Sequence, residues 1–348
     1  MAALRRQHLK LALIAPACVL AACGSSSSHS SSSASTTSSV PSTASTTPAG
    51  PPASPVSLSA AEHPAAGQFP SARGRTLQQL AARVRPGAQL GAATGSFTPG
   101  PQRRFAFALN TSAGAFVYAP TAIYLARTPN SPAQGPYLAP ADPLEVPPAD
   151  RSAQNTGPGG IQAIYAAQVP LPRPGTELVL ALTRTASGLT GATGEIAIAA
   201  HSPSPDAGQP APKVATDTLA SVGGRRSLLT TRQPPESMAS ASLPQVLGRR
   251  PVALLFSTPQ LCISRVCGPV TDIAVYLQHR FGSRITFIHQ EIYVNNQPSK
   301  GLRPQMKAYG LQTEPWLFTI DRRGRIAARL EGSFGVNAFT AALQAALR

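Results

Sequence analysis

Short apolar runs, separated by clusters of Gly, Pro and Asn, occupy the first half of the folded chain. They are RFAFAL at 104, AFVY at 115, AIYLA at 122, AIYAAQV at 163, ELVLALT at 177 and EIAIAA at 195. Runs of this length and spacing are typical of an all-β sandwich. We therefore expect a β-sandwich over residues 71–205, of the immunoglobulin-like kind, with a surface loop rich in Pro, Ala and Gly over about 127–160.

The pattern changes after a Pro- and Ser-rich connector at 206–245. The apolar run PVALLF at 251–256 predicts a buried strand, and GPVTDIAVYLQHRFG at 268–282 predicts an amphipathic helix. A second strand, a helix or loop, a strand-turn-strand hairpin and a last helix capped by Asn337 follow. Residues 246–348 are thus expected to form an α/β domain with the order β-α-β-(α)-β-β-α.

The N-terminus has the layout of an export signal. Basic residues precede an apolar stretch, Leu11 to Ala22, that is shorter than the ~20 residues a membrane-spanning helix needs. It ends in Leu-Ala-Ala-Cys, which resembles a bacterial lipobox, in which the chain is cut before the cysteine and the cysteine is lipidated. We expect a signal peptide at 1–22, a lipid anchor at Cys23 and attachment to the outer face of the cell membrane. The Ser/Thr/Pro-rich segment 23–70 is predicted to be a disordered tether.

Charge narrows the range of partners. The formal net charge is +16, which favours the anionic membrane face or acidic cell-wall polymers. The arginines are scattered and no nucleic-acid-binding motif is present, so we expect no nucleic-acid partner. The predicted sandwich shows no paired carboxylates, no Ser-His-Asp order and no metal-ligand cluster. Its expected role is binding or scaffolding.

Two cysteines are left for chemistry after export. Cys18 leaves with the signal and Cys23 is lipidated, so Cys262 and Cys267 remain in a compartment where a disulfide can persist. Cys267 falls at the start of a predicted helix, whose unpaired N–H groups and dipole favour a thiolate. We therefore expect Cys267 to be the nucleophile, helped by Arg265, and Cys262 its resolving partner. The reverse assignment stays open.

Two motifs in the last hundred residues resemble the thioredoxin family. CGP at 267–269 matches part of that family's Trp-Cys-Gly-Pro-Cys motif, and TEPWLFTIDRRGRI at 313–326 resembles the segment that carries its cis-proline, which would be Pro315. The arrangement TPxxCxSRxCGPV behind a β-domain is similar to exported actinobacterial thioredoxin-like lipoproteins. The motif's second cysteine falls at Val270, so the usual Cys-x-x-Cys pair is replaced by an atypical Cys-x4-Cys pair.

This resemblance implies a thioredoxin-like fold and thiol-disulfide exchange on the thiols and disulfides of exported proteins. Cys262, Cys267 and Pro315 would be the catalytic residues, with no cofactor and no metal. A disulfide that closes so small a loop stabilises a fold by only ~2 kcal/mol, which speaks against a purely structural role.

Two other functions are open. The missing Cys-x-x-Cys favours a non-catalytic binding or scaffold protein with a structural disulfide. A copper-handling protein would use the cysteine pair with His289, as Sco-type copper chaperones use a Cys-x3-Cys pair with a distant histidine. Thiolates and an imidazole suit Cu(I).

Overall fold

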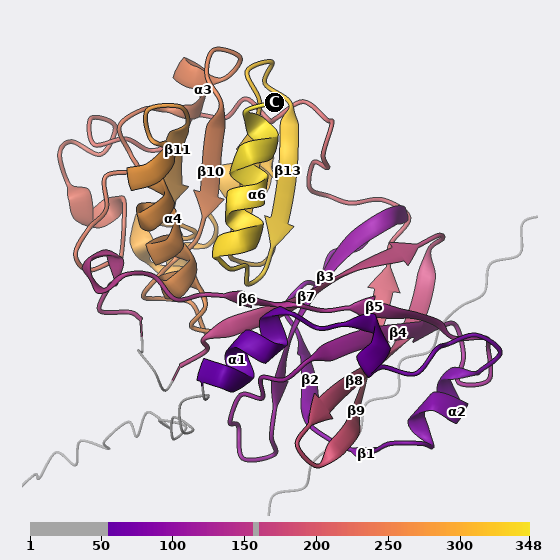
Figure 1. The fold of residues 1–348 in the computed structure, drawn as a ribbon. Coiled ribbons are helices and arrows are strands. Elements are labelled where there is room, and N and C mark those ends of the chain that lie inside the picture. The colour runs from indigo at the N-terminus through magenta and orange to yellow at the C-terminus, as the bar shows by residue number, and fades with distance from the viewer. Residues whose placement is uncertain (1–54, 156–159) are drawn as a thin grey trace, which may run out of the picture. The chain divides into compact units, whose positions relative to one another are not determined.

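A computed structural model of the chain describes residues 55–155 and 160–348 (Figure 1). The predicted signal peptide, Cys23 and most of the predicted tether lie outside these residues. Among the described helices, none has both the length and the apolar character needed to cross a membrane. The lipid anchor and the location at the cell membrane stay predictions.

The first domain consists of two β-sheets. In the five-stranded sheet, the order β1-β9-β8-β4-β5 is formed by β1 (Arg85–Pro86), β4 (Thr121–Ala126), β5 (Gln134–Leu138), β8 (Gly175–Thr185) and β9 (Gly188–Ile198). In the four-stranded sheet, the order β2-β3-β7-β6 is formed by β2 (Gln89–Ala92), β3 (Gly100–Asn110), β6 (Ala141–Pro143) and β7 (Ala163–Leu171). Five of the six apolar runs form strands, whereas AFVY contributes only an isolated bridge at Phe116.

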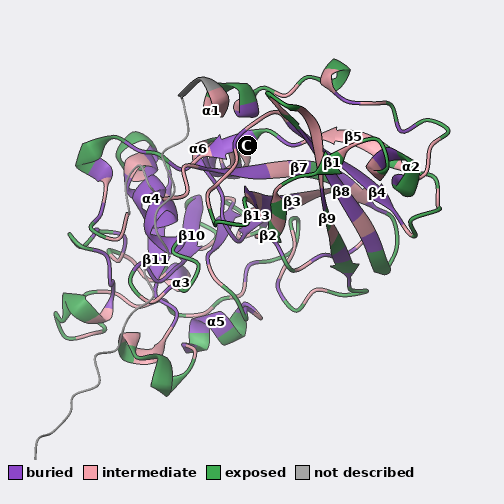
Figure 2. Cartoon of the chain, turned by 90° about the horizontal axis from the view of Figure 1, so that it is seen from below, coloured by how far each residue is buried: buried purple, intermediate pink, exposed green. Residues whose placement is uncertain are grey.

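Aromatic side chains from β3 and β7 fill the space between the two sheets. Phe105, Phe107 and Tyr165 are buried, and the ring centroids of successive pairs lie 5.3 Å apart. The facing sheet contributes Val179 and Ile196 to the same core. Buried positions follow the strands while turns are exposed (Figure 2), as two packed sheets require. The immunoglobulin-like connectivity stays a prediction.

Part of the predicted tether is folded. Helix α1 (Pro55–Glu62) places Ala61, which is fully buried, and Leu58 against the core between the sheets. Phe69 is buried in a second cluster with Leu80 of helix α2 (Leu77–Ala81). This last part of the segment 23–70 carries apolar side chains that its Ser-rich part lacks, and these side chains fix it to the sandwich.

The expected surface loop over 127–160 is also more ordered than its composition suggests. It contains strands β5 and β6, and the residues after β6 bury Leu144 and Val146 in the core of the second domain. Pro and Ala are compatible with strand ends and with close packing. A Pro-rich composition therefore did not distinguish a solvated loop from a segment docked on a neighbouring surface.

The C-terminal domain is built on one four-stranded sheet of order β11-β10-β12-β13. Its strands are β10 (Val252–Phe256), β11 (Thr286–Gln290), β12 (Trp316–Ile320) and β13 (Ile326–Glu331). Strand β10 pairs parallel with β11 and antiparallel with β12, which pairs antiparallel with β13. This arrangement confirms the predicted strand-helix order and the thioredoxin-like class of the domain.

Helices cover both faces of this sheet. Helices α4 (Cys267–Phe281) and α6 (Val336–Ala346) lie side by side on one face (Figure 1) and share a core with β10 and β12. Helix α5 (Pro304–Ala308) and helix α3 (Leu243–Val246) contribute to the core on the opposite face. The run PVALLF is continuously apolar because both faces of β10 are buried.

The start of α6 is capped by the other domain, and the prediction of Asn337 as its cap is wrong. Gly335 occupies the cap position, and it has no side chain that could bond the helix. The Asp142 carboxylate of β6 instead accepts hydrogen bonds from the backbone N–H groups of Gly335, Asn337 and Ala338 at 2.9, 2.9 and 3.0 Å. A carboxylate at a helix N-terminus satisfies its unpaired donors, so the sandwich holds the last helix.

The connector at 206–245 lies against the C-terminal domain. Its backbone bonds the β13 hairpin through Gly208 and Ala211, and its side chains Thr230, Arg232 and Met238 are buried.

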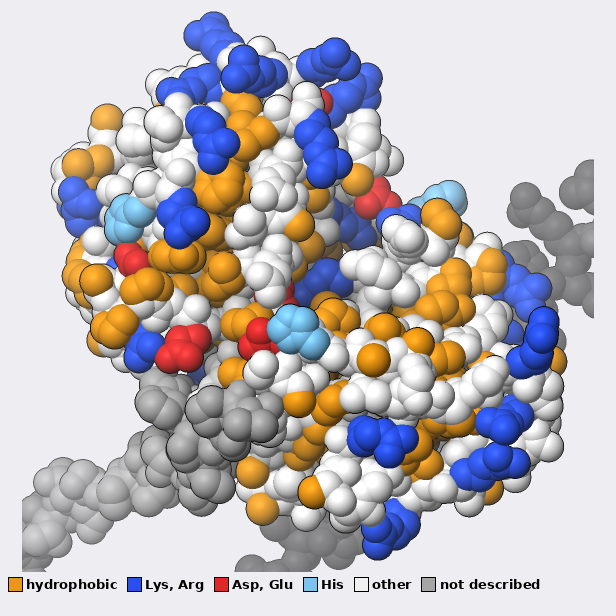
Figure 3. Space-filling view, in the orientation of Figure 1, with side chains coloured by type: hydrophobic (Ala, Val, Ile, Leu, Met, Phe, Trp, Pro, Cys, Tyr) orange, Lys and Arg blue, Asp and Glu red, His pale blue; other side chains and the backbone are white. Residues whose placement is uncertain are grey.

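On the face seen in Figure 3, Lys and Arg side chains are spread over the surface and outnumber Asp and Glu, in keeping with the net charge of +16. The domain boundaries set from the sequence stay predictions.

Candidate thiol site

The loop between β10 and α4 carries both cysteines. Just after β10, the carbonyl of Thr258 accepts hydrogen bonds from the backbone N–H groups of Leu261 and Cys262 at 3.2 and 3.1 Å. Arg265 has a φ of 58°, in the left-handed region that most residues avoid. These tight turns bring Cys262 back to the start of the helix that begins at Cys267.

The two thiols are in contact. Cys262 and Cys267 pack in one cluster with Val266, and both are free thiols. The Cys262 sulfur lies 3.2 Å from the hydroxyl oxygen of Ser264. Cys262 is 7% exposed and Cys267 is 0% exposed. The site therefore opens to solvent, narrowly, at Cys262 alone.

These surroundings move the two thiol pKa values in opposite directions. The hydrogen bond from Cys267, aided by Ser264 and the N–H groups at the helix start, overcomes burial and lowers the pKa of Cys262 to about 6. Burial, and next the Cys262 thiol, raises the pKa of Cys267 well above its ordinary value. Cys262 is thus the better nucleophile, the reverse of the favoured sequence assignment. The helix N-terminus faces its sulfur, whereas Cys267 is sealed inside.

The predicted cis-proline lies next to the cysteine loop. The register of β10 with β12 runs up to Trp316, and the peptide bond between Glu314 and Pro315 is cis, as the resemblance implied. Burial, and then the Cys262 charge, raises the pKa of Glu314 to about 7. Burial also raises the pKa of Tyr293, helped by the charges of Glu314 and both cysteines. A carboxyl group with a pKa of about 7 therefore interacts electrostatically with the Cys262 thiol.

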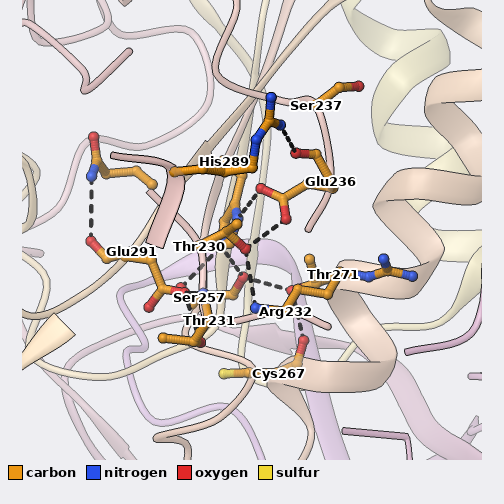
Figure 4. A network of polar contacts seen from close by, with 12 residues as sticks. Thr230, Thr231, Arg232, Glu236, Ser237, Ser257, Cys267, Thr271, His289 and Glu291 are labelled. Carbon is orange, nitrogen blue, oxygen red and sulfur yellow. Dashed lines mark hydrogen bonds and ion pairs between the residues drawn. The ribbon is translucent and has the colours of Figure 1, made fainter. Parts of the chain in front are cut away.

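Buried polar side chains connect the helix start to the interior of the domain (Figure 4). Glu236 Oε1 lies 2.8 Å from His289 Nδ1, and His289 Nε2 lies 2.9 Å from Ser257 Oγ. Ser257 Oγ lies 2.8 Å from Thr271 Oγ1, which donates to the Cys267 carbonyl at 2.7 Å. This row of hydrogen-bonded side chains fixes the first turn of α4. Its members come from the connector, β11, the residue after β10 and α4 itself.

This row of hydrogen-bonded side chains contains an ion pair between Glu236 and His289. Burial opposes the charged form of His289, but the charge and hydrogen bond of Glu236 outweigh it and raise the pKa of His289. Burial likewise opposes ionisation of Glu236, and His289 outweighs it and lowers the pKa of that carboxyl. Each partner thus keeps the other charged inside the protein.

A second buried carboxyl, Glu291, lies one residue beyond β11. Its Oε1 accepts from the N–H group and the hydroxyl of Thr231 at 2.6 and 2.8 Å. Its Oε2 and the nearby hydroxyl of Thr258 have no hydrogen-bond partner among the described residues. Burial raises the pKa of Glu291, because it penalises the charged form of the carboxyl group.

The structure does not place His289 with the cysteines as a third copper ligand. Both ring nitrogens of His289 are engaged, with Glu236 on one side and Ser257 on the other. Over residues 55–155 and 160–348, no group of three or more His, Cys, Asp or Glu side chains could hold a metal ion. The Sco-like arrangement considered from the sequence is therefore corrected to a buried hydrogen-bonded histidine.

Sequence reasoning found the two cysteines, Pro315 and His289 but missed the groups around them. Glu236 lies in a connector that reads as low complexity, and Ser257 and Thr271 are ordinary residues at the ends of predicted elements. Such residues carry no recognisable spacing because they come from separate segments. The one signal in the sequence was His289 itself, a lone histidine at the end of the predicted second strand.

The strand order of the C-terminal sheet defines a thioredoxin-like domain, and the loop after its first strand carries the paired thiols. Comparison with solved structures found two thiol:disulfide interchange proteins. A candidate thiol:disulfide interchange protein DsbE from Chlorobium tepidum is 17% identical, with a TM-score of 0.30, over 42% of this chain and 100% of that chain. A thiol:disulfide interchange protein of the thioredoxin family from Chlorobium tepidum TLS is 18% identical, with a TM-score of 0.29, over 40% and 97%. No protein-family model and no curated protein matches the chain. The class therefore depends on the strand order described above.

Proposed function

We propose that the C-terminal domain catalyses thiol-disulfide exchange on exported proteins, with Cys262 as the attacking thiol and Cys267 as the resolving thiol. The observation that carries this proposal is the contact between two free thiols whose pKa values are shifted in opposite directions. Exchange requires a thiolate near neutral pH with a second thiol in reach. Strongly perturbed ionisable groups of this kind gather at functional sites.

The steps balance in atoms and electrons. The Cys262 thiolate attacks one sulfur of a client disulfide, the client S–S bond breaks, and the other client sulfur leaves as a thiolate and takes up a proton. Cys267 then loses its proton and attacks the Cys262 sulfur. This step forms the Cys262–Cys267 disulfide and releases the second client thiolate. The client gains two electrons, the domain loses two, and the same steps in reverse oxidise a client dithiol.

Glu314 supplies an acid-base group for this cycle. Its carboxyl titrates near pH 7 and senses the charge on Cys262. In the neutral form it can give a proton to a departing thiolate, and as the carboxylate it can accept one when a thiol ionises. This role agrees with the location of Glu314 directly before Pro315, in the segment that the thioredoxin resemblance marks.

The proposal includes a location. The lipobox-like segment supports lipidation at Cys23, and the Ser-rich stretch that follows would let the folded part reach substrates away from the membrane. Exported proteins are the expected clients because thiol exchange is useful where disulfides form. A radiolabelled fatty acid that is incorporated into the full chain, and not into its Cys23→Ala variant, would support this location.

Trapping tests the chemistry directly. In the Cys267→Ser variant, the resolving thiol is missing, so a mixed disulfide between Cys262 and a client should accumulate and be released by dithiothreitol. The matched control, Cys262→Ser, should trap nothing because its remaining thiol is buried. The expected result is a ladder of disulfide-linked species in the first variant alone. Absence of trapped species, together with no insulin reduction by the unaltered protein, would rule out the enzyme.

One observation favours a second candidate, a binding protein with a structural pair. Both cysteines have little exposed surface, 7% and 0%. The reduction potential separates the two functions, since structural disulfides in exported proteins fall below about −300 mV and active ones lie above it. A potential for the Cys262–Cys267 pair well above that value supports exchange, and one below it supports the structural pair.

A further inference from the structure

A segment of the sandwich domain crosses the start of helix α4. We call residues 148–155, which lie between β6 and β7, the strap. Its backbone is paired with the connector: Ala153 N donates to Gln233 O at 2.8 Å, and Gln233 N donates to the Gln154 side chain at 2.9 Å. The strap therefore belongs to the first domain by chain order and to the second domain by its bonds.

A buried charge on α4 anchors the strap. Asp272 Oδ2 accepts from the backbone N–H group and hydroxyl of Ser152 at 3.0 and 3.1 Å, and from Asn155 at 3.3 Å. Its other oxygen accepts from Arg232 at 2.9 Å, and Arg232 also donates to the Asp150 carbonyl at 2.7 Å. Because Asp272 and Arg232 are 0% and 3% exposed, these bonds compete with little water.

The strap and Ile161, which lies near the start of the next described stretch of the same domain, contact the thiol site. A Cβ atom placed on Gly268 would lie 2.9 Å from the carbonyl oxygen of Gln154, so the strap approaches the CGP segment closely enough to require a glycine. Ile161 packs on the cluster that Cys262, Val266 and Cys267 form. The sandwich domain therefore contributes to the cover over Cys267, whose exposed fraction is zero.

We propose that the strap and Ile161 are positioning elements of the thiol site, supplied by the sandwich domain, which keep clients and water from Cys267 so that only Cys262 engages a client disulfide. The statement that only Cys262 engages a client disulfide rests on the proposed function. The shielding of Cys267 does not rest on it and can be tested without a client. This gives the sandwich domain a part in the chemistry, beyond scaffolding.

The strap and Ile161 together form the cover over Cys267, which we call the shield. It has a consequence for the order of the steps in thiol-disulfide exchange. A client can form a mixed disulfide at Cys262 but cannot reach Cys267. Cys267 therefore reacts only with the Cys262 sulfur. Loss of the shield would let small oxidants and clients attack Cys267 as well. It would also lower the pKa of Cys267, because burial is the largest cause of its elevation.

Alkylation of the full chain tests the shield without any client. In a Cys262→Ser background, we expect iodoacetamide to modify Cys267 slowly, and Ile161→Ala to raise that rate by roughly tenfold or more as the site opens. The pH midpoint of the reaction should fall in the same variant, and a urea titration must show that its free energy of unfolding is retained, because a thiol exposed by unfolding would also titrate at lower pH than the buried one. Ile263→Ala is the matched control, because Ile263 lies in the same loop, directly after position 262, but is 98% exposed, and it should leave rate and midpoint unchanged.

A second variant decides the matter if Ile161→Ala does not fold, as judged by circular dichroism. Gly268→Ala should push the strap away through the Gln154 carbonyl and raise the Cys267 rate similarly, whereas Gly91→Ala, with no atom within 4 Å of its added carbon, should not. Rapid modification of Cys267 without either change, or unchanged rates in both Ile161→Ala and Gly268→Ala, would overturn the shield. A working shield with no trapped client would refute the proposed function alone.

Discussion

The core between the sandwich sheets and the core around the end of β10 differ in chemical character. In the sandwich, Phe105, Phe107 and Tyr165 stack, and the tyrosine hydroxyl finds a backbone partner, the N–H group of Ala119 at 2.8 Å. Beside the thiol site, an ion pair of Glu236 and His289 is buried at the end of a sheet. Both regions are closely packed, but only the second buries both partners of a charged pair, since the buried Glu177 of the sandwich pairs with an Arg127 side chain that is 23% exposed.

The buried ion pair beside the thiol site costs free energy that the stability of the fold alone does not require. Burying two charges is unfavourable even when they pair well, and an apolar pair of similar volume is often as stable or more so. Buried charges near perturbed thiols are a mark of a functional site. We infer that the sandwich core serves stability, and that the second core also serves the arrangement of the cysteines.

The largest effect is expected from a substitution that removes the buried Glu236–His289 ion pair. His289→Ala leaves the Glu236 carboxylate buried without its partner, so we expect a loss of about 3–5 kcal/mol in the free energy of unfolding. His279→Ala is the control, since the His279 side chain is 65% exposed and its pairing with Asp150 should be worth less than about 1 kcal/mol. Urea titrations of both variants measure the difference, and equal losses would contradict the comparison.

The next effect concerns the thiol pair. In the reduced protein, the rate of Cys262 alkylation should rise with pH around a midpoint of about 6 and fall away in more acidic solution, as the thiolate becomes protonated. Cys267→Ala removes the bond that lowers this pKa most, so its midpoint should move up toward the ordinary value of about 8.5. Cys267→Ser keeps a hydroxyl donor and should lie between the two. A midpoint near 8.5 in all three proteins would disprove the assignment of Cys262.

A smaller effect tests how the two regions are joined. Asp142→Ala removes the cap of α6 that the sandwich supplies, and we expect a loss of about 1–2 kcal/mol. Asn337→Ala removes the side chain that the sequence marked as the cap, and its effect should stay within about 0.5 kcal/mol. Thermal unfolding of the two variants compares them, and the reverse ranking would mean that α6 is capped from within its own domain.

The smallest effect is expected at the edge of the thiol site. Ile263 is 98% exposed, so Ile263→Ala should change the free energy of unfolding by no more than about 0.5 kcal/mol. Denaturant unfolding checks this value. A loss comparable to that of a buried isoleucine would show that the cysteine loop packs differently from the structure described.

The sequence by itself determined most of the elements of both domains and pointed to the candidate site residues. Period-2 runs such as AIYAAQV became strands, because one face of each strand must be buried and the alternation records that face. PVALLF became a central strand for the related reason that both its faces are covered. The two cysteines and Pro315 were found from short motifs, since such motifs carry their chemistry in adjacent positions.

The tertiary structure alone decided which thiol has the lower pKa, what caps α6 and what lies against the site. The pKa of each thiol depends on burial and on donors that the folded chain brings near, so the folded surroundings favour Cys262 where helix position by itself favoured Cys267. Asp142 and the strap act on residues more than one hundred positions away. Contacts over such distances leave no periodic pattern, because their partners are fixed by packing and not by spacing along the chain.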